Sequence, residues 1–183
     1  MRLEHLESEE ALTGFLRGFE EGTLPKAEWT HGAHVAAAAY YLRTALGADT
    51  KDAEIPQLPA EDVGRYGAPR LAGLDNLSRS AFDAAYDTIL PVMRQRIQSY
   101  NLAVGGANTA TSGYHETLTR FWLRIVVAHL REAPDLSPWQ AARRAVAEFG
   151  EKRALHADYY SGDVVKDSAA RLGWREPDLR PLP

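Results

Sequence analysis

The stretch Val35-Ala36-Ala37-Ala38-Ala39-Tyr40-Tyr41-Leu42 contains only apolar and aromatic residues. Alanine and leucine favour helix, and a helix that is apolar on all sides must be covered by other elements. Thr30 suits an N-cap before this stretch, and Gly47 suits a C-cap after it. The sequence therefore predicts a central, buried helix from about residue 29 to residue 46.

Helical periodicity extends to both sides of this segment. Ser8 can cap a first helix that has one apolar stripe and ends near Gly22. Four later segments predict helices over residues 79–100, 115–132, 138–150 and 162–172. Pro91 is expected to kink the first of these four. No strand or hairpin pattern occurs, so we expect an all-α fold: a compact bundle of about five to six helices, in one domain spanning residues 1–183.

Residues 48–78 interrupt the helical pattern. Pro56, Pro59 and Pro69 punctuate this stretch together with several glycines, and its apolar periodicity is weak. A connection of this length in a compact domain is usually functional or mobile. We therefore expect an insertion or lid over the bundle.

Composition excludes several classes of function. The chain has 183 residues, a net charge of −4 and no cysteine. Disulfides, thiolate metal sites and a cysteine nucleophile are therefore excluded. Nucleic acid is not an expected partner, because binding it requires a concentrated basic face.

The same bulk features predict the compartment. There is no apolar run of about 18 residues that could span a membrane. The first residues, Met1 to Leu6, are charged and lack the apolar core of a signal peptide. We expect a cytoplasmic protein that has no membrane partner and acts on a small molecule, and the sequence is compatible with a homo-oligomer.

Two short motifs carry the chemistry. His31 and His34 lie three residues apart at the start of the second predicted helix, so they share one face. His115 and Glu116 open the fourth predicted helix after a polar turn. Helix starts that face each other across a bundle can build a metal site, and three imidazoles leave one coordination position open. His31, His34 and His115 are thus the predicted ligands of a transition metal: Fe, Cu or Zn.

Glu116 and two tyrosines are the candidate catalytic groups beside these histidines. Glu116 could be a fourth ligand or a general base. Adjacent residues diverge by about 100° on a regular helix, however, so His115 and Glu116 could share an ion only if the first turn were distorted. A glutamate in the first turn is also favoured by the helix dipole without any function. Tyr114 and Tyr160 could orient a substrate, although Tyr160 is equally suited to packing.

An anion site is a further possibility at the fourth predicted helix. The turn over residues 108–113 has hydroxyls and backbone N–H groups at a helix start, and Arg120 follows. Asn108, Thr117 and Arg120 are therefore candidate substrate-binding residues for a carboxylate. The competing interpretation needs no ligand: threonine and serine before a helix are common caps, and Thr117 is a residue at the edge of the core.

The combination of motifs resembles an uncharacterised family of small bacterial cytoplasmic proteins. The residues that carry the resemblance are Trp29-Thr30-His31-x-x-His34, Gly113-Tyr114-His115-Glu116-Thr117, Tyr160-Ser161 and Trp174-x-Glu176-Pro177-Asp178-Leu179. The resemblance implies that both histidine motifs mark the group, but it implies no activity or substrate. Members of the family connect the second and third helices more briefly, so residues 48–78 look like an addition.

Three functions remain open from the sequence. The first is a mononuclear metal-dependent enzyme that acts on a small organic molecule, with oxygenase or oxidase chemistry preferred to hydrolysis. The second is a metal-free acid–base lyase, isomerase or cyclase that uses the same histidines and Glu116. The third is a non-catalytic protein that binds a metal or small ligand. Chelation separates the first from the second, and lack of turnover identifies the third.

Overall fold

The computed structural model describes residues 3–49 and 72–183, which contain helices and no strand. The long helices are α1 (Glu9–Glu20), α2 (His31–Asp49), α3 (Ala72–Ala103), α4 (Glu116–Arg131) and α5 (Pro138–Phe149). A short α6 (Ser168–Leu172) and the 3₁₀ turns η1 (Leu3–Leu6), η2 (Lys26–Glu28) and η3 (Leu155–Asp158) complete the described part. The predicted all-α bundle is confirmed.

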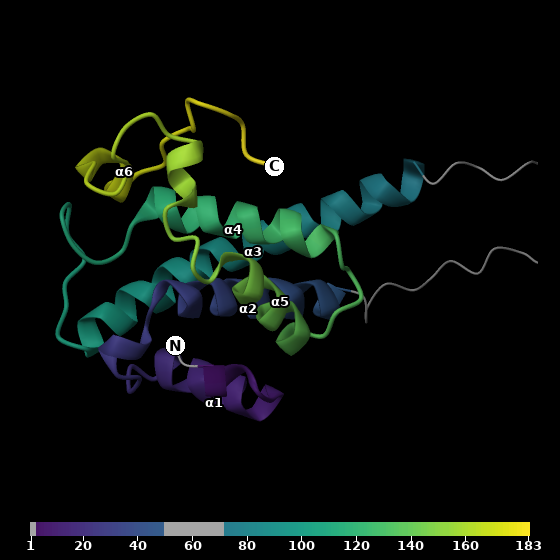
Figure 1. The fold of residues 1–183 in the computed structure, drawn as a ribbon, viewed down its shortest axis with the longest axis horizontal. Coiled ribbons are helices and arrows are strands. Elements are labelled where there is room, and N and C mark those ends of the chain that lie inside the picture. Colours follow the sequence, from purple (N-terminus) through teal and green to yellow (C-terminus); the bar gives the residue numbers. More distant parts are fainter. Residues whose placement is uncertain (1–2, 50–71) are drawn as a thin grey trace, which may run out of the picture.

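Helix α2 is the centre of the bundle. It packs on α3, α4 and α5, and Figure 1 shows it inside the bundle, with α1 on one side and α3 and α4 on the other. Residues 35–39 and Leu42 are fully or almost fully buried. Short alanine side chains let the neighbouring helices approach closely, so the apolar run has the central position predicted for it.

Local capping sets the observed helix boundaries. The Ser8 hydroxyl accepts a hydrogen bond from the Ala11 N–H at 3.1 Å, and Ser137 forms a capping box with Gln140. Asp167 caps α6, so this helix begins at Ser168 and not near residue 162, as the periodicity had predicted. Helix α3 begins earlier than predicted, at Ala72, and continues through Pro91.

The predicted insertion over residues 48–78 is partly corrected. Residues 48–49 form the end of α2, and residues 72–78 form the first turns of α3. Residues 50–71 lie outside the described residues. In the part of the chain that the structure describes, no helix is both long enough and apolar enough to cross a membrane.

The C-terminal residues form a second layer on α4. Phe121 and Ile125 of α4 pack with Tyr159, Tyr160 and Val164 in a small apolar cluster separate from the main core. Helix α6 also contacts α4. This layer covers the start of α4, where the polar motif predicted from the sequence lies.

Candidate functional site

The loop before α4 fixes the directions of the motif residues. The Asn108 side-chain oxygen accepts hydrogen bonds from Asn101 Nδ2 at 2.8 Å and from the Tyr114 N–H at 3.1 Å. Its amide nitrogen donates to the Gln98 carbonyl at 2.9 Å. Gly113 has φ +79°, and a Cβ there would lie 2.0 Å from the Ala107 oxygen, so only glycine fits. Asn108 therefore holds the loop against α3 through its side-chain oxygen and one of its two amide N–H groups.

A cavity of about 590 Å³ lies between α2, α3 and α4. We call it the histidine pocket, because four histidines line it: His31, His34, His115 and His156. Most of its other lining is apolar, including Met93, Ile97, Leu118, Trp122 and Leu123. The pocket therefore brings all three predicted metal ligands to one cavity, together with a fourth histidine.

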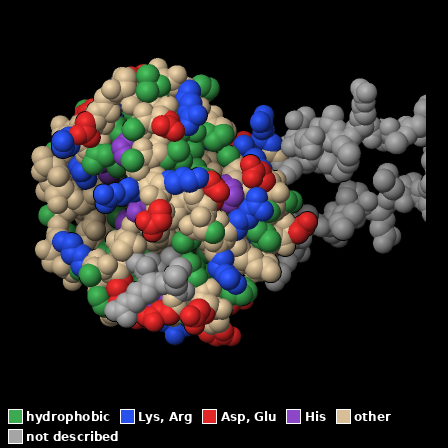
Figure 2. All heavy atoms as spheres, viewed as in Figure 1, with side chains coloured by type: hydrophobic (Ala, Val, Ile, Leu, Met, Phe, Trp, Pro, Cys, Tyr) green, Lys and Arg blue, Asp and Glu red, His purple; other side chains and the backbone are tan. Residues whose placement is uncertain are grey.

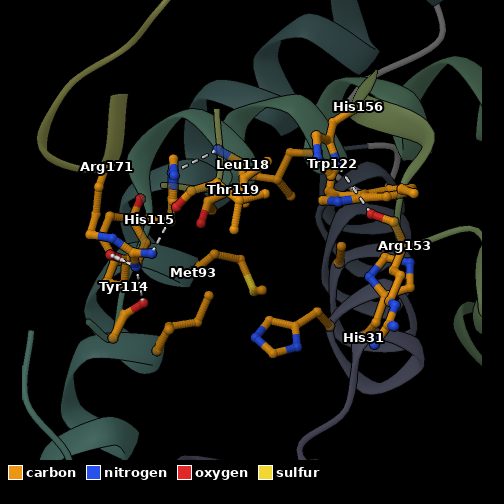
Figure 3. Close-up of a pocket in the computed structure, with 17 residues that line it drawn as sticks. His31, Met93, Tyr114, His115, Leu118, Thr119, Trp122, Arg153, His156 and Arg171 are labelled. Carbon is orange, nitrogen blue, oxygen red and sulfur yellow. Dashed lines mark hydrogen bonds between the residues drawn. The ribbon is translucent and has the colours of Figure 1, made fainter. Parts of the chain in front are cut away.

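The histidines are spread along this pocket. Figure 3 shows two groups at opposite ends, with Met93 and Leu118 between them: Tyr114, His115 and Arg171 at one end, and His31, Trp122, Arg153 and His156 at the other. On the face drawn in Figure 2, histidine side chains lie beside basic side chains where the surface is hollowed. His31 and His115 thus share a cavity, but they do not meet at one point in it.

His31 and His34 are each held by one ring nitrogen. His31 donates from Nε2 to the Phe149 carbonyl at 3.1 Å, and His34 donates from Nδ1 to the Thr30 carbonyl at 2.8 Å. Because a carbonyl can only accept, these bonds fix both tautomers. His31 Nδ1 and His34 Nε2 make no hydrogen bond with the described residues.

Burial keeps these two imidazoles neutral. It lowers the pKa of His31 below its ordinary value and lowers the pKa of His34 to about 4. The rings also contact aromatic neighbours, with His31 4.5 Å from Trp122 and His34 4.3 Å from Trp29 between ring centroids. At neutral pH each ring therefore offers one lone pair in an apolar setting.

His115 has a different part in the structure. It is the N-cap of α4, with Nδ1 accepting from the Leu118 N–H at 3.3 Å, while Nε2 donates to the buried Val164 carbonyl at 2.9 Å. Burial lowers its pKa, so the ring is neutral. Both ring nitrogens are thus engaged, and His115 could bind a metal only if it gave up the helix cap.

Glu116 faces a second cavity, of about 420 Å³. We call this the arginine pocket, because Arg94, Arg120 and Arg171 line it. The Glu116 carboxylate accepts from Arg94 Nε at 3.0 Å and Nη2 at 2.6 Å, and from Arg120 Nε at 2.6 Å. Burial alone would raise the pKa of Glu116, but hydrogen bonds from Arg94, Tyr114 and Arg120 outweigh it and lower the pKa. Glu116 is therefore ionised, and it does not line the histidine pocket.

Tyr114 and Arg171 line both pockets. The Tyr114 hydroxyl donates to Glu116 Oε2 at 2.7 Å, and burial raises its pKa to about 12, so the phenol is neutral. Arg171 donates from Nη1 to the Gly113 and Tyr114 carbonyls, at 2.9 and 3.3 Å. These two residues form a shared wall at the start of α4.

Thr117 and Tyr160 line neither pocket. The fully buried Thr117 hydroxyl donates to the Gly173 carbonyl at 2.7 Å and accepts from the Arg175 N–H at 3.0 Å. The buried Tyr160 hydroxyl donates to the Arg175 carbonyl at 3.2 Å. Both hydroxyls hold the C-terminal layer on α4, and the substrate-binding and catalytic roles predicted for these two residues stay predictions.

Most residues that line the histidine pocket were not among the predicted site residues. Met93, Arg153, His156 and Arg171 line the histidine pocket, but none of them belongs to a short motif. His156 donates from Nδ1 to the Arg153 carbonyl at 3.1 Å, so it resembles His31 and His34 in its anchoring. A lone histidine and two isolated arginines carry no local pattern that points to a pocket, because they reach it only through the tertiary fold.

The donor set predicted for a metal is not assembled in the described residues. Within residues 3–49 and 72–183 no group of three or more His, Asp or Glu side chains is placed to hold an ion. His115 is committed at both nitrogens, and Glu116 is committed to two arginines. The predicted three-histidine centre does not fit this arrangement, and dependence on Fe, Cu or Zn stays a prediction.

Comparisons with known proteins do not identify a relative of this chain. No known protein family matches the chain, and neither a curated protein nor a solved structure does. The resemblance of the two histidine motifs to a bacterial family stays a prediction. The function is therefore inferred from the two pockets themselves.

Proposed function

We propose that the histidine pocket binds a small, largely apolar organic molecule and that His31 and His34 exchange protons with it. The reaction class is metal-free acid–base chemistry, as in a lyase, isomerase or cyclase. The observation that carries this proposal is His34, which is anchored at Nδ1 and has an Nε2 without a partner among the described residues of an apolar pocket. The pocket's volume of about 590 Å³ suits such a ligand, since small-molecule sites span about 300–1,000 Å³.

The protonation states support this chemistry. A neutral imidazole can accept a proton from the ligand, and the bond from its other nitrogen to a carbonyl stabilises the imidazolium that forms. The pKa of about 4 makes His34 a weak base in the empty pocket. An anionic ligand would raise that pKa towards neutrality, where proton transfer is most efficient. Arg153 and Arg171, at opposite ends of the pocket, provide positive charge for such a ligand.

A metal-dependent reaction is the second candidate, favoured by one observation. Histidines that bind metals usually donate their other ring nitrogen to a carbonyl or carboxylate, as His31 and His34 do here. Two such ligands could hold an ion together with groups of the substrate. Oxygenase or oxidase chemistry would then be the class to assay.

Ligand binding and metal content test the proposal together. We expect 2-naphthoate, an apolar aromatic carboxylate, to bind the wild type whether or not it has been treated with EDTA. In the complex Nε2 of His34 takes up a proton and donates to the carboxylate, because the anion raises the pKa of the ring. His34→Gln cannot become a cation, so it should weaken binding about tenfold, as expected for the loss of one charge-assisted hydrogen bond. His5→Gln is the matched control, because His5 bonds Glu28 outside both pockets. Calorimetry measures the affinities.

Two results would overturn the metal-free proposal. Near-stoichiometric Fe, Cu or Zn in tag-free protein, lost in His34→Gln, would establish the second candidate. Equal naphthoate affinity in the wild type and in His34→Gln would remove His34 from the ligand site.

A further inference from the structure

The arginine pocket has an excess of positive charge. Its lining contains the cations Arg94, Arg120 and Arg171 and one carboxylate, Glu116, which gives three positive charges against one negative. The side chain of Glu116 is only 7% exposed, whereas those of Arg94 and Arg120 are 39% and 32% exposed. The anion is thus buried at the base of the pocket, and the two guanidinium groups extend towards solvent.

Glu116 holds the two guanidinium groups side by side. Arg94 reaches it from α3 with two nitrogens, and Arg120 reaches it from one turn later on α4 with Nε. Without the carboxylate between them, the two neighbouring guanidinium groups would repel each other. Arg120 Nη1 and Nη2 make no hydrogen bond with the described residues, so they remain available to a ligand.

Neutral donors and an aromatic ring complete the lining. Gln98 lines the pocket from α3, and its side-chain amide has no hydrogen-bond partner among the described residues. Trp174 lies at 5.8 Å from the Arg120 guanidinium, which restricts where that group can move. Planar guanidinium groups bind oxyanions through two parallel hydrogen bonds, and pre-ordering them lowers the entropic cost of binding.

We propose that the arginine pocket is a binding site for phosphate, either as the free ion or as a phosphate monoester. The lining has an excess of two positive charges, which a dianion neutralises completely. A ligand with a single carboxylate would neutralise only one of them. The site does not rest on the function proposed for the histidine pocket. It shares Tyr114 and Arg171 with that pocket, so a bound phosphate would sit behind their common wall.

Titration calorimetry at constant ionic strength tests the site. We expect inorganic phosphate to bind the wild type saturably, and Arg120→Gln to weaken binding at least tenfold through the loss of charged hydrogen bonds. Arg96→Gln is the matched control. It removes the same charge from α3 two residues beyond Arg94, where Arg96 pairs with Glu20 away from the pocket. Arg94→Lys keeps the charge without the two-point contact, and it replaces Arg120→Gln if that variant does not fold.

The competing outcomes are distinct. Phenyl phosphate binding more tightly than inorganic phosphate would identify a monoester as the ligand, and equal or weaker binding would identify the free ion. The site is wrong if the wild type shows no saturation up to about 10 mM phosphate, the affinity range of the weakest specific ligands. It is also wrong if Arg96→Gln loses as much affinity as Arg120→Gln.

Discussion

The two pockets at the start of α4 share a wall but differ in how they treat charge. The histidine pocket holds His31, His34 and His115, whose pKa values burial lowers, so these three rings are neutral. The arginine pocket holds Glu116, which is as buried as His115, in its charged form, because Arg94, Tyr114 and Arg120 donate hydrogen bonds to it. Burial neutralises a group that lacks a charged partner and leaves charged a group that has two.

One dipeptide divides its side chains between these two environments. His115 is the extended N-cap residue of α4, and Glu116 is the first residue with helical geometry. The side chain of His115 therefore lines the histidine pocket, and that of Glu116 lines the arginine pocket. Adjacent side chains at a helix start point in different directions, so His115 and Glu116 belong to two candidate sites and do not form one metal centre.

Acidification should lower the stability of the protein through the histidine pocket before it affects the arginine pocket. This loss of stability is the largest effect we expect. The pKa of His34 is 6.5 in the unfolded chain and about 4 in the folded protein, so protons bind the unfolded state preferentially. The neutral His34 ring makes its full contribution to the free energy of unfolding above pH 6.5. This contribution, about 3 kcal/mol, is lost as the pH falls from 6.5 to about 4. Urea unfolding at several pH values measures this loss.

Two variants show which pocket causes the loss. His34→Gln cannot titrate at this position, so it should reduce the loss of stability between pH 6.5 and 4, and His31 and His115, whose pKa values burial also lowers, account for the loss that remains. Glu116→Gln should change the profile only below the ordinary glutamate pKa of 4.5, because the lowered pKa of Glu116 confines its titration to that range. An unchanged profile in His34→Gln would mean that burial does not depress the pKa of this ring.

The cap of α4 should show the next largest effect. His115→Ala removes the acceptor for the Leu118 N–H and leaves the buried Val164 carbonyl without its donor. We expect a loss of about 2 kcal/mol, of which about half comes from the cap and half from the buried carbonyl. His115→Asn can still cap the helix, so it should lose only about 1 kcal/mol. Chemical denaturation measures both.

The same variants test the metal hypothesis independently. If His115 only caps α4, then His115→Ala and His115→Asn keep the metal content of the wild type. Loss of a stoichiometric ion in both variants would show that His115 leaves the cap to bind metal. Equal stability losses in the two variants would show that the cap contributes little.

Much of the fold could be predicted from local patterns. The apolar run after His34 required a covered helix, and Ser8 marked a helix start that the structure confirms. The polar motifs were also placed correctly at the starts of α2 and α4. These features depend on residues a few positions apart, which periodicity and capping rules describe well.

The roles of the site residues could not be predicted in the same way. His115 bonds Val164, which is 49 residues later, and Glu116 bonds Arg94, which is 22 residues earlier. Both partners depend on how α3 and the C-terminal layer pack on α4, and no local pattern encodes that packing. Thr117 looked equally suited to a substrate and to the core, and its bonds to Gly173 and Arg175 assign it to the core.

Filling the histidine pocket should have the smallest effect on stability and a selective effect on binding. Ala38 lines that pocket from α2 and is only 2% exposed. In Ala38→Met the longer side chain can extend into the cavity, so we expect a stability change of less than about 1 kcal/mol in either direction. Naphthoate binding should be lost, while phosphate binding in the arginine pocket should be unchanged. Ala147→Met adds the same side chain at an exposed position of α5 and should alter neither the naphthoate affinity nor the phosphate affinity.

This last substitution separates two interpretations of the shared wall. If Tyr114 and Arg171 only divide the cavities, then blocking one cavity leaves the other with its wild-type affinity. If the wall moves when a ligand binds, then Ala38→Met also changes the phosphate affinity, because a ligand-sized side chain next to the wall restricts both residues. The first result would make the pockets independent sites, and the second would make them two parts of one site.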